Sequence, residues 1–270
     1  ADPSVELSFW NLGRLLSAGI RREVSWFDPH LHGAGYWCWK PFIMLRELES
    51  LQEGDYLLYT DAGRPPGTLF RHSVQPLVQW LEEKGQDILP GVNISYYTGD
   101  LSRWCKQSVF DALNLDIRDF EHSPLIQPTP CFLKKSEESV RILREWMELC
   151  RQFSLVSSPT PEEKSRCRDN FADHTHDQTL WSLVAAMNHL DCLYSGKGVI
   201  HLDGRQPFLR HPGFDDKDPD FFLGELGAER VERPLLTFLS GVHQGIAFCE
   251  KAVNKLSKIA GLGPLKGFYG

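Results

Sequence analysis

One uninterrupted apolar run, Tyr56–Thr60 (YLLYT), most constrains the fold of this chain. The run follows Gly54 and ends on Asp61, and its side chains do not alternate between apolar and polar as in a strand with one solvent-facing side. Such a run is typical of a strand covered on both faces, as in a parallel sheet between helices. Sheets of this kind bind ligands at the carboxyl ends of their strands, which is where Asp61 lies.

Helical patterns alternate with short apolar segments along the rest of the chain. The clearest helix is Glu137–Phe153, whose apolar residues fall on one stripe behind a capping Ser136. The other expected helices are Trp39–Leu51, Leu69–Lys84, Leu101–Leu113 (capped by Asp100), Asp177–Asn188 and Gln244–Ala260. The other expected strands or extended segments are Val5–Trp10, Asn93–Tyr97, Leu125–Leu133 and Cys192–Tyr194. We therefore predict an α/β fold with a Rossmann-type, mostly parallel sheet flanked by helices, in a single domain over residues 1–270.

Two stretches lack periodicity and are expected to be loops. Ser157–Asn170 is polar and contains prolines, and residues 195–234 are rich in Gly, Pro, Asp and Arg. A long irregular segment within a compact domain is more often functional than structural, so residues 195–234 are expected to form a functional loop region.

Composition and missing motifs exclude several classes of protein. The net charge of −7 disfavours a nucleic-acid binder, which would usually be basic. No apolar run approaches the roughly 20 residues of a transmembrane helix, and the first residues, ADPSVELSFW, do not resemble a signal peptide. A dinucleotide-binding glycine motif, a phosphate-binding Walker loop and a serine-hydrolase elbow are also missing.

The seven cysteines leave two interpretations open. None forms a C-x-x-C pair, which disfavours a structural zinc site. They are either buried thiols or members of disulfides in a secretory compartment, where the glycosylation triplet Asn93–Ser95 would be used. A secretory or Golgi lumen is favoured if an N-terminal anchor has been removed, and the cytoplasm otherwise.

Two groups of residues, one directly after the expected strand Tyr56–Thr60 and one at the start of the helix before it, are candidates for ligand binding. Asp61 and the neighbouring Gly63 would suit a ligand at a strand end, although both are also common turn residues. Trp37, Trp39 and Lys40 combine aromatic faces that suit sugars or bases with a cation that suits phosphate. The alternative is that the tryptophans are core residues and the lysine is solvated.

The densest polar cluster, DHTHDQ, lies just before the helix that begins at Asp177. His174 and His176 can bind a metal or donate to phosphate, and Asp177 and Gln178 lie at the positive end of the helix. The alternative is a capped helix with surface histidines. His243 opens the last expected helix and is a further candidate, with capping and packing as its alternative role.

Three stretches in this order, GYWCWKP, GDYLLYTDAG and HTHDQTLWSLV, resemble a family of GT-A-type glycosyltransferases of bacterial, phage and algal polysaccharide synthesis. The resemblance runs from about Trp26 to His189. It implies a single GT-A-like catalytic domain, a hexosyl- or pentosyltransferase that moves a sugar from a UDP- or GDP-linked donor to a glycan or other hydroxyl acceptor. Residues 195–234 would then lie on the acceptor side.

The resemblance also implies roles for individual residues. Asp61 matches the aspartate of a D-x-D-type motif and would bind a divalent cation, manganese in particular, with His243 completing the site, while Gly63 replaces the second carboxylate. Asp177 would hold sugar hydroxyls and Gln178 would lie near the anomeric carbon, as in retaining enzymes with a front-face mechanism. The other donor-binding residues would be Trp37, Trp39, Lys40, Lys106, His174 and His176.

Two other functions remain open. The missing second carboxylate would suit a non-catalytic carbohydrate-binding protein that keeps a degenerate transferase fold. A metal-dependent hydrolase built on Asp61, His174, His176 and Asp177 is the other alternative.

Overall fold

A computed structural model describes residues 8–61, 75–95, 99–196, 199–201 and 207–210. The first half of the expected strand Val5–Trp10, the expected helix Gln244–Ala260, and the candidate residues Gly63 and His243 lie outside these ranges. The described half of that strand, residues 8–10, does not form a strand. The chain divides into two compact units. The first comprises Ala1–Leu57, Asp100–Leu125 and Lys134–His189, and the second comprises Leu58–Gly99, Ile126–Leu133 and Leu190–Gly270.

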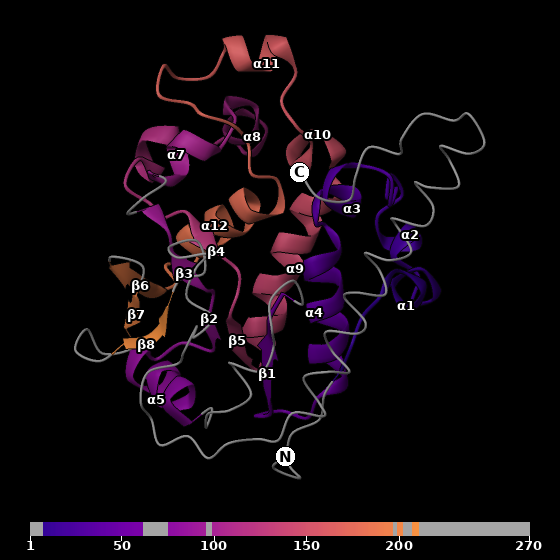
Figure 1. The fold of residues 1–270 in the computed structure, drawn as a ribbon, viewed down its shortest axis with the longest axis vertical. Helices are drawn as coiled ribbons and strands as arrows, with labels where there is room; N and C mark the ends of the chain where they lie inside the picture. Colours follow the sequence, from indigo (N-terminus) through magenta and orange to yellow (C-terminus); the bar gives the residue numbers. More distant parts are fainter. Residues whose placement is uncertain (1–7, 62–74, 96–98, 197–198, 202–206, 211–270) are drawn as a thin grey trace, which may run out of the picture. The chain divides into compact units, whose positions relative to one another are not determined.

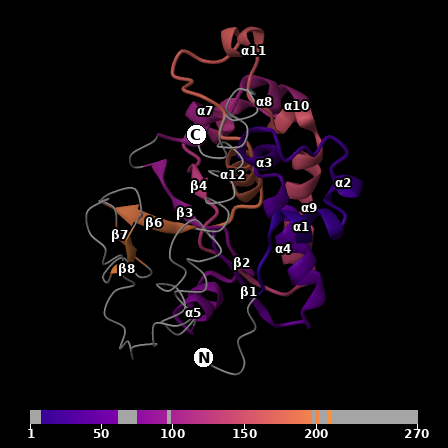
Figure 2. The same cartoon turned by 45° about the vertical axis from the view of Figure 1, so that its right-hand side comes forward.

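The first unit is built around the long helix α9 (Glu137–Arg151). Helices α4 (Trp39–Ser50) and α12 (Asp177–Met187) both pack against α9 (Figures 1 and 2). These three helices agree with the sequence predictions to within about two residues at each end. The shorter elements of this unit are α1 (Leu12–Ser17), α2 (Ile20–Glu23), α3 (His32–Tyr36), α7 (Leu101–Trp104), α8 (Gln107–Leu113), the 3₁₀ helix η2 (Ile117–Phe120), α10 (Phe153–Val156) and α11 (Pro161–Ser165).

Local sequence explains why α9 begins and packs as it does. Ser136 and Ser139 form a reciprocal capping box, and two glutamates in the first turn complement the helix dipole. Its buried stripe centres on Leu143 and Trp146, both fully shielded from solvent. Trp146 stacks on Trp181 of α12 with ring centroids 4.6 Å apart, so an aromatic pair joins these two helices.

The second unit contains α5 (Gln75–Lys84) and most of the strands. One sheet has the order β1 (Tyr56–Tyr59), β5 (Cys131–Lys134), β2 (Ile88–Leu89), and the boundary between the two units passes through β1. The other has the order β4 (Ile126–Gln127), β3 (Val92–Asn93), β6 (Leu193–Gly196), β7 (Val199–His201), β8 (Pro207–Arg210).

These sheets show a mixed α/β fold, and the strands with described positions do not show the expected mostly parallel sheet. Strands β3 and β6 pair in parallel, whereas the pairs β2–β5, β3–β4, β6–β7 and β7–β8 are antiparallel. The apolar run that suggested a strand covered on both faces is also only partly covered. Tyr56 is exposed, Leu57 and Leu58 are half-buried, and only Tyr59 is buried. An apolar run of four residues therefore did not establish two-sided burial.

Three further elements differ from the sequence predictions. The expected helix Leu101–Leu113 is divided into α7 and α8, because Cys105 and Lys106 adopt extended backbone angles. The expected loop Ser157–Asn170 contains α11, which begins with a capping box from Thr160. The segment 195–234, expected to be irregular, contains β7 and β8 within its described residues.

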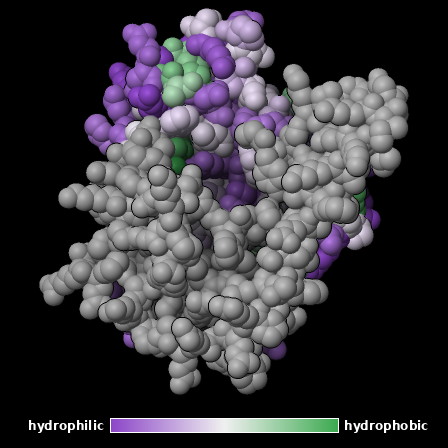
Figure 3. Space-filling model, viewed as in Figure 1, coloured by the Kyte–Doolittle hydropathy of each residue, from purple (hydrophilic) through white to green (hydrophobic). Residues whose placement is uncertain are grey.

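The part of the described surface that Figure 3 shows is mostly polar. In the view of Figure 3 it is largely hydrophilic, with hydrophobic colour in small patches. The exposed large apolar side chains are Phe9, Leu12, Tyr56, Phe153 and Met187. Within the described ranges, none of the helices has the length and apolar character needed to span a membrane.

A left-handed backbone run precedes α4 and was not foreseen from the sequence. Gly33, Ala34, Gly35, Tyr36 and Trp37 all have positive φ, from 50° to 91°. Left-handed helical geometry costs non-glycine residues roughly 1–2 kcal/mol each, so such runs are rare. Gly35 adds a steric constraint, because a Cβ atom there would lie 2.9 Å from ring carbons of Phe27.

We expect Gly35→Ala to lower the free energy of unfolding more than Gly54→Ala does. The two glycines have φ of 91° and 90°, but a Cβ on Gly54 would meet nothing within 4 Å. Gly54→Ala should therefore cost only backbone strain, about 1 kcal/mol, and Gly35→Ala a further 1–3 kcal/mol, roughly, from overpacking. Urea unfolding followed by tryptophan fluorescence measures both, and equal losses would contradict the left-handed packing against Phe27.

Candidate functional site

A buried ion pair joins the first turns of two helices in the first unit. Lys40 Nζ, from the start of α4, lies 3.6 Å from Asp177 Oδ2, from the first residue of α12. Lys40 is 7% exposed and Asp177 only 2%. Charges at this depth lose most of their hydration, and a lysine at the positive end of a helix is disfavoured further. The carboxylate of Asp177 compensates for both effects.

Asp177 is held by its main chain as well as by its charge. Trp146 Nε1 donates to the carbonyl oxygen of Asp177 at 3.0 Å. The preceding residue, His176, has φ 56° and ψ −122°, a backbone conformation outside the common regions. Burial, and then the charge of Asp177, raise the pKa of the Cys38 thiol, which keeps this neighbour neutral.

Both histidines of the H-x-H segment donate to main-chain carbonyls. His174 Nε2 lies 2.8 Å from the carbonyl oxygen of Leu155, and His176 Nδ1 lies 2.8 Å from that of Val156. Because a carbonyl oxygen only accepts, these nitrogens carry the ring protons. Burial lowers the pKa of His174 to about 3 and that of His176 to about 4, so both rings are neutral at pH 7.

The tautomers determine what the other ring nitrogens can do. Nδ1 of His174 is buried and has no hydrogen-bond partner within the described ranges. In His176 the proton is on Nδ1, so Nε2 is the acceptor of that ring. A neutral imidazole with a free lone pair readily accepts a hydrogen bond from a hydroxyl group, but it has no positive charge to attract phosphate. The geometry therefore favours contact with a hydroxyl group over the phosphate contact expected from the sequence.

Lys106 lies in a second buried polar cluster of the same unit. Its side chain is fully buried, and Nζ donates to the carbonyl of Ser157 at 3.1 Å and lies 3.3 Å from Glu163 Oε1. Burial alone would raise the pKa of Glu163, but hydrogen bonds from Ser108 and Thr160 and the charge of Lys106 lower it to about 2. These contacts also explain why the chain leaves helical geometry between α7 and α8. They favour a structural role for this lysine.

The two tryptophans of the GYWCWKP stretch differ in position. Trp37 ends the left-handed run, and its ring centroid lies 4.9 Å from that of His32 and 6.0 Å from that of His176. Trp39 Nε1 donates to the carbonyl of Gly33 at 3.3 Å and so supports the run. Trp37 is therefore brought to the histidine segment, whereas Trp39 fixes the backbone that positions it.

Gln178 follows Asp177 in the first turn of α12. Its side chain is half-buried, its main-chain N–H donates to the carbonyl of Thr175 at 3.1 Å, and its own carbonyl accepts from Ser182 Oγ at 2.8 Å. These hydrogen bonds fix the main chain of Gln178. Its side-chain amide follows directly in sequence after Asp177, the acidic member of the ion pair.

Asp61 belongs to the second unit, where its side chain and its main chain are both anchored. Tyr59 Oη donates to Asp61 Oδ1 at 2.7 Å, and the Asp61 N–H donates to Thr129 Oγ1 at 3.1 Å. Among the residues with described positions, no three His, Cys, Asp or Glu side chains are grouped to bind a metal ion. The described residues therefore do not form a manganese site by themselves, and the second ligand expected from the sequence, His243, lies outside them.

The described cysteines are thiols. Cys38, Cys105, Cys131 and Cys150 are buried, and all of them, like Cys167 and Cys192, are free. For these six residues the structure agrees with the first of the two interpretations of the sequence.

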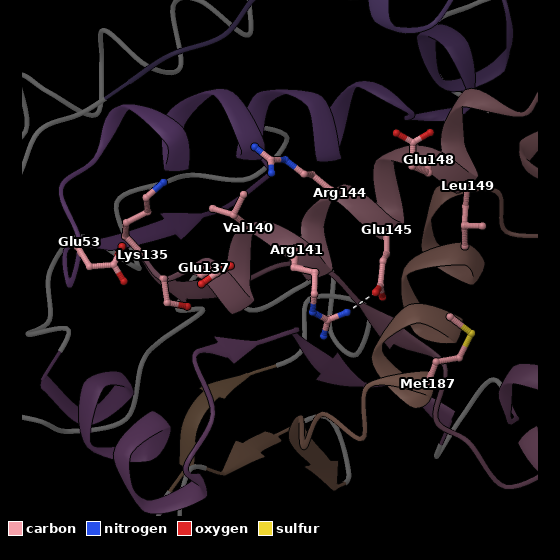
Figure 4. A pocket seen from close by; sticks show the side chains of 11 residues that line it. Glu53, Lys135, Glu137, Val140, Arg141, Arg144, Glu145, Glu148, Leu149 and Met187 are labelled. Carbon is pink, nitrogen blue, oxygen red and sulfur yellow. Dashed lines mark hydrogen bonds and ion pairs between the residues drawn. The ribbon is translucent and has the colours of Figure 1, made fainter.

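A separate hollow of about 700 Å³ runs along the exposed side of α9 and is lined mainly by charged side chains (Figure 4). Arg141 pairs with Glu138 and Glu145, and Arg144 pairs with Glu49 at 2.9 Å. These ion pairs compensate the charges of both arginines, and none of the candidate residues lines the hollow.

No family model, curated protein or solved structure matches the chain.

We expect the neutral histidines to make stability depend on pH. Unfolded histidine has a pKa near 6.5, so below that pH the unfolded chain binds protons that the folded chain does not. Stability present above about pH 6.5 should be lost as the pH falls toward 4 and then 3, by up to about 1.4 kcal/mol per pH unit for each histidine. Urea unfolding at a series of pH values measures this loss.

His176→Asn should make this pH dependence shallower, because the variant loses one of the two titrating rings. The matched control is His122→Gln, since His122 is exposed. If His176→Asn shows the same slope as the wild type, His176 is not held neutral in the folded chain.

Proposed function

We propose that the chain is a glycosyltransferase that uses a nucleotide-sugar donor, with its sugar-binding centre at Lys40, Asp177 and Gln178. We also propose that the chain forms a GT-A-like catalytic domain. The proposal is supported by the order of the three sequence stretches and by the chemistry of the residues in the first unit.

The buried Lys40–Asp177 pair carries the proposal. One partner comes from the GYWCWKP stretch and the other from the DHTHDQ stretch, so two motifs far apart in the chain meet through their charged residues. A pair buried this deeply is weak evidence for stability, since apolar replacements are often neutral or stabilising. Buried charges with specific partners are instead typical of functional sites.

Glycosyl transfer makes demands that these groups can meet. The bond between the anomeric carbon and the diphosphate oxygen breaks, the acceptor oxygen bonds to that carbon, and the acceptor's proton passes to the leaving diphosphate. Asp177 accepts hydrogen bonds from sugar hydroxyls and its charge stabilises the cationic sugar of the transition state. Lys40 orients this carboxylate, and the Gln178 amide lies on the sugar side. Transfer with retention of configuration is part of the proposal, because it needs no further carboxylate as a nucleophile.

A divalent cation would stabilise the diphosphate as it leaves. Asp61, in the second unit, is the described residue proposed to contact this cation. We assign no step to the metal, because the described residues do not make up its ligand set.

We expect Asp177→Asn to lower turnover by about 10²–10³-fold, which is typical for removing one group that stabilises a transition state. The matched control is Asp173→Asn, because Asp173 is an exposed carboxylate of the same segment. Release of nucleoside diphosphate from a panel of UDP- and GDP-sugars measures turnover. Full activity of Asp177→Asn would refute the site, and a wild type that binds glycans but turns over no donor would favour a non-catalytic binding protein.

A double variant separates function from stability. Lys40→Met with Asp177→Leu removes both buried charges, so it should unfold at or above the wild-type temperature and still be inactive. Lys40→Met alone leaves a buried carboxylate uncompensated and should cost roughly 3–5 kcal/mol. Thermal unfolding of both variants is the measurement, and a double variant less stable than the single one would show that the pair is mainly structural.

A further inference from the structure

A cluster of aromatic rings in the first unit extends from the histidine segment to the surface. We call it the aromatic ledge; its members are Trp26, His32, Tyr36, Trp37, Phe153 and His176. Tyr36 lies at its centre, with ring centroids 4.7 Å from His176, 6.0 Å from Phe153 and 6.4 Å from both Trp26 and His32.

The ledge is open to solvent at one side. Phe153 is 44% exposed and His32 is exposed, whereas Trp26, Tyr36 and Trp37 are half-buried and His176 is 7% exposed. An exposed group of rings that includes residues of the left-handed run needs a reason other than core packing.

The polar groups of the ledge are suited to a neutral ligand. Trp26 Nε1 is already used, since it donates to the main-chain oxygen of Arg151 at 2.7 Å. The guanidinium of Arg151 pairs with Glu23 and Glu148, so its charge is compensated. His176 is neutral and has Nδ1 bonded to Val156, which leaves Nε2 as an acceptor. Ring faces beside a neutral acceptor match a ligand with an apolar face and hydroxyl groups at its edge.

We infer that the aromatic ledge binds a neutral pyranose of the acceptor glycan, with its apolar face on the exposed ring of Phe153, its edge against Tyr36 and one hydroxyl donating to His176 Nε2. A pyranose has both surfaces, and the aromatic rings supply large rigid contact areas for its C–H face. Because His176 immediately precedes Asp177, a sugar on the ledge lies beside the residue proposed to hold the donor sugar. The inference rests on the proposed function and adds the class of acceptor.

Saturation-transfer NMR on the full chain with maltose, cellobiose, lactose and diacetylchitobiose tests this inference without any donor. At least one disaccharide should bind at millimolar concentration, with transfer strongest to protons of one ring face. Phe153→Ala should weaken binding about fivefold, as expected for one lost aromatic contact, and Phe153→Tyr should restore it. The control is Phe9→Ala, because Phe9 is 50% exposed and outside the ledge.

His176→Asn tests the hydroxyl contact separately. An asparagine amide can still donate to Val156, and asparagine tolerates positive φ, but the acceptor at the Nε2 position is lost. Binding should weaken about fivefold, the effect of one lost hydrogen bond. Because the buried ring of His176 packs against Tyr36, the variant also loses packing, so binding is compared at a temperature at which both proteins are folded.

Three results would overturn the inference. The first is that none of these disaccharides binds, and the second is that Phe153→Ala and His176→Asn both bind sugar as tightly as the wild type. The third is that Phe153→Ala changes the sedimentation coefficient of the protein but not its affinity for sugar. The last would make the ledge a contact between copies of the chain. The two hypotheses are tested by different measurements. Disaccharide binding alone tests the aromatic ledge, whereas turnover of the donor tests the proposed function.

Discussion

The contact on which the candidate site depends is made by Trp146 of α9. Its ring packs against Trp181, and its Nε1 atom donates to the carbonyl of Asp177, so one side chain fixes both the body of α12 and its first residue. Helix α4 packs on the same α9, which brings Lys40 to the carboxylate. The charged pair is thus placed by an apolar helix core, and the rigidity of this core keeps two poorly hydrated charges at a fixed separation.

The two histidines that shortly precede Asp177 in sequence are buried and electrically neutral. The last two residues of α10 and Ser157 directly after it present successive carbonyls that accept hydrogen bonds from His174, His176 and Lys106, and these bonds fix both imidazole tautomers. Since burial keeps the rings neutral, the positive charge beside Asp177 is that of Lys40 rather than of a histidine. The region thus has two chemically distinct parts. One is the charged pair Lys40–Asp177 at the starts of two helices, and the other consists of neutral histidines that can accept hydrogen bonds from hydroxyl groups, with aromatic rings beside them.

How much of this could be predicted from sequence depended on the type of signal. Helices α4, α9 and α12 follow apolar stripes and caps, which are local, and their positions were predicted correctly. The mostly parallel sheet was predicted from the apolar run Tyr56–Thr60 and from the alternation of expected strands with helices, and neither signal specifies strand pairing or the covering of the faces of β1. The break at Lys106 follows from burial of its ammonium beside Glu163, a contact remote in sequence. The left-handed run had one readable sign, Gly33 and Gly35 on either side of Ala34, but nothing local shows that Ala34, Tyr36 and Trp37 share it.

Departures from ordinary folding preferences gather around His176, and this gathering supports a functional site independently of the motif resemblance. Lys40 lies at the unfavourable end of a helix dipole, His176 has a strained backbone, Ala34, Tyr36 and Trp37 adopt left-handed geometry, and His174 has a buried acceptor without a described partner. Each departure opposes folding by itself, and well-formed core interactions such as the Trp146–Trp181 pair must offset it. Natural sequences are otherwise consistent from local preference to global packing, so several such departures in one neighbourhood are expected where binding or catalysis requires that geometry.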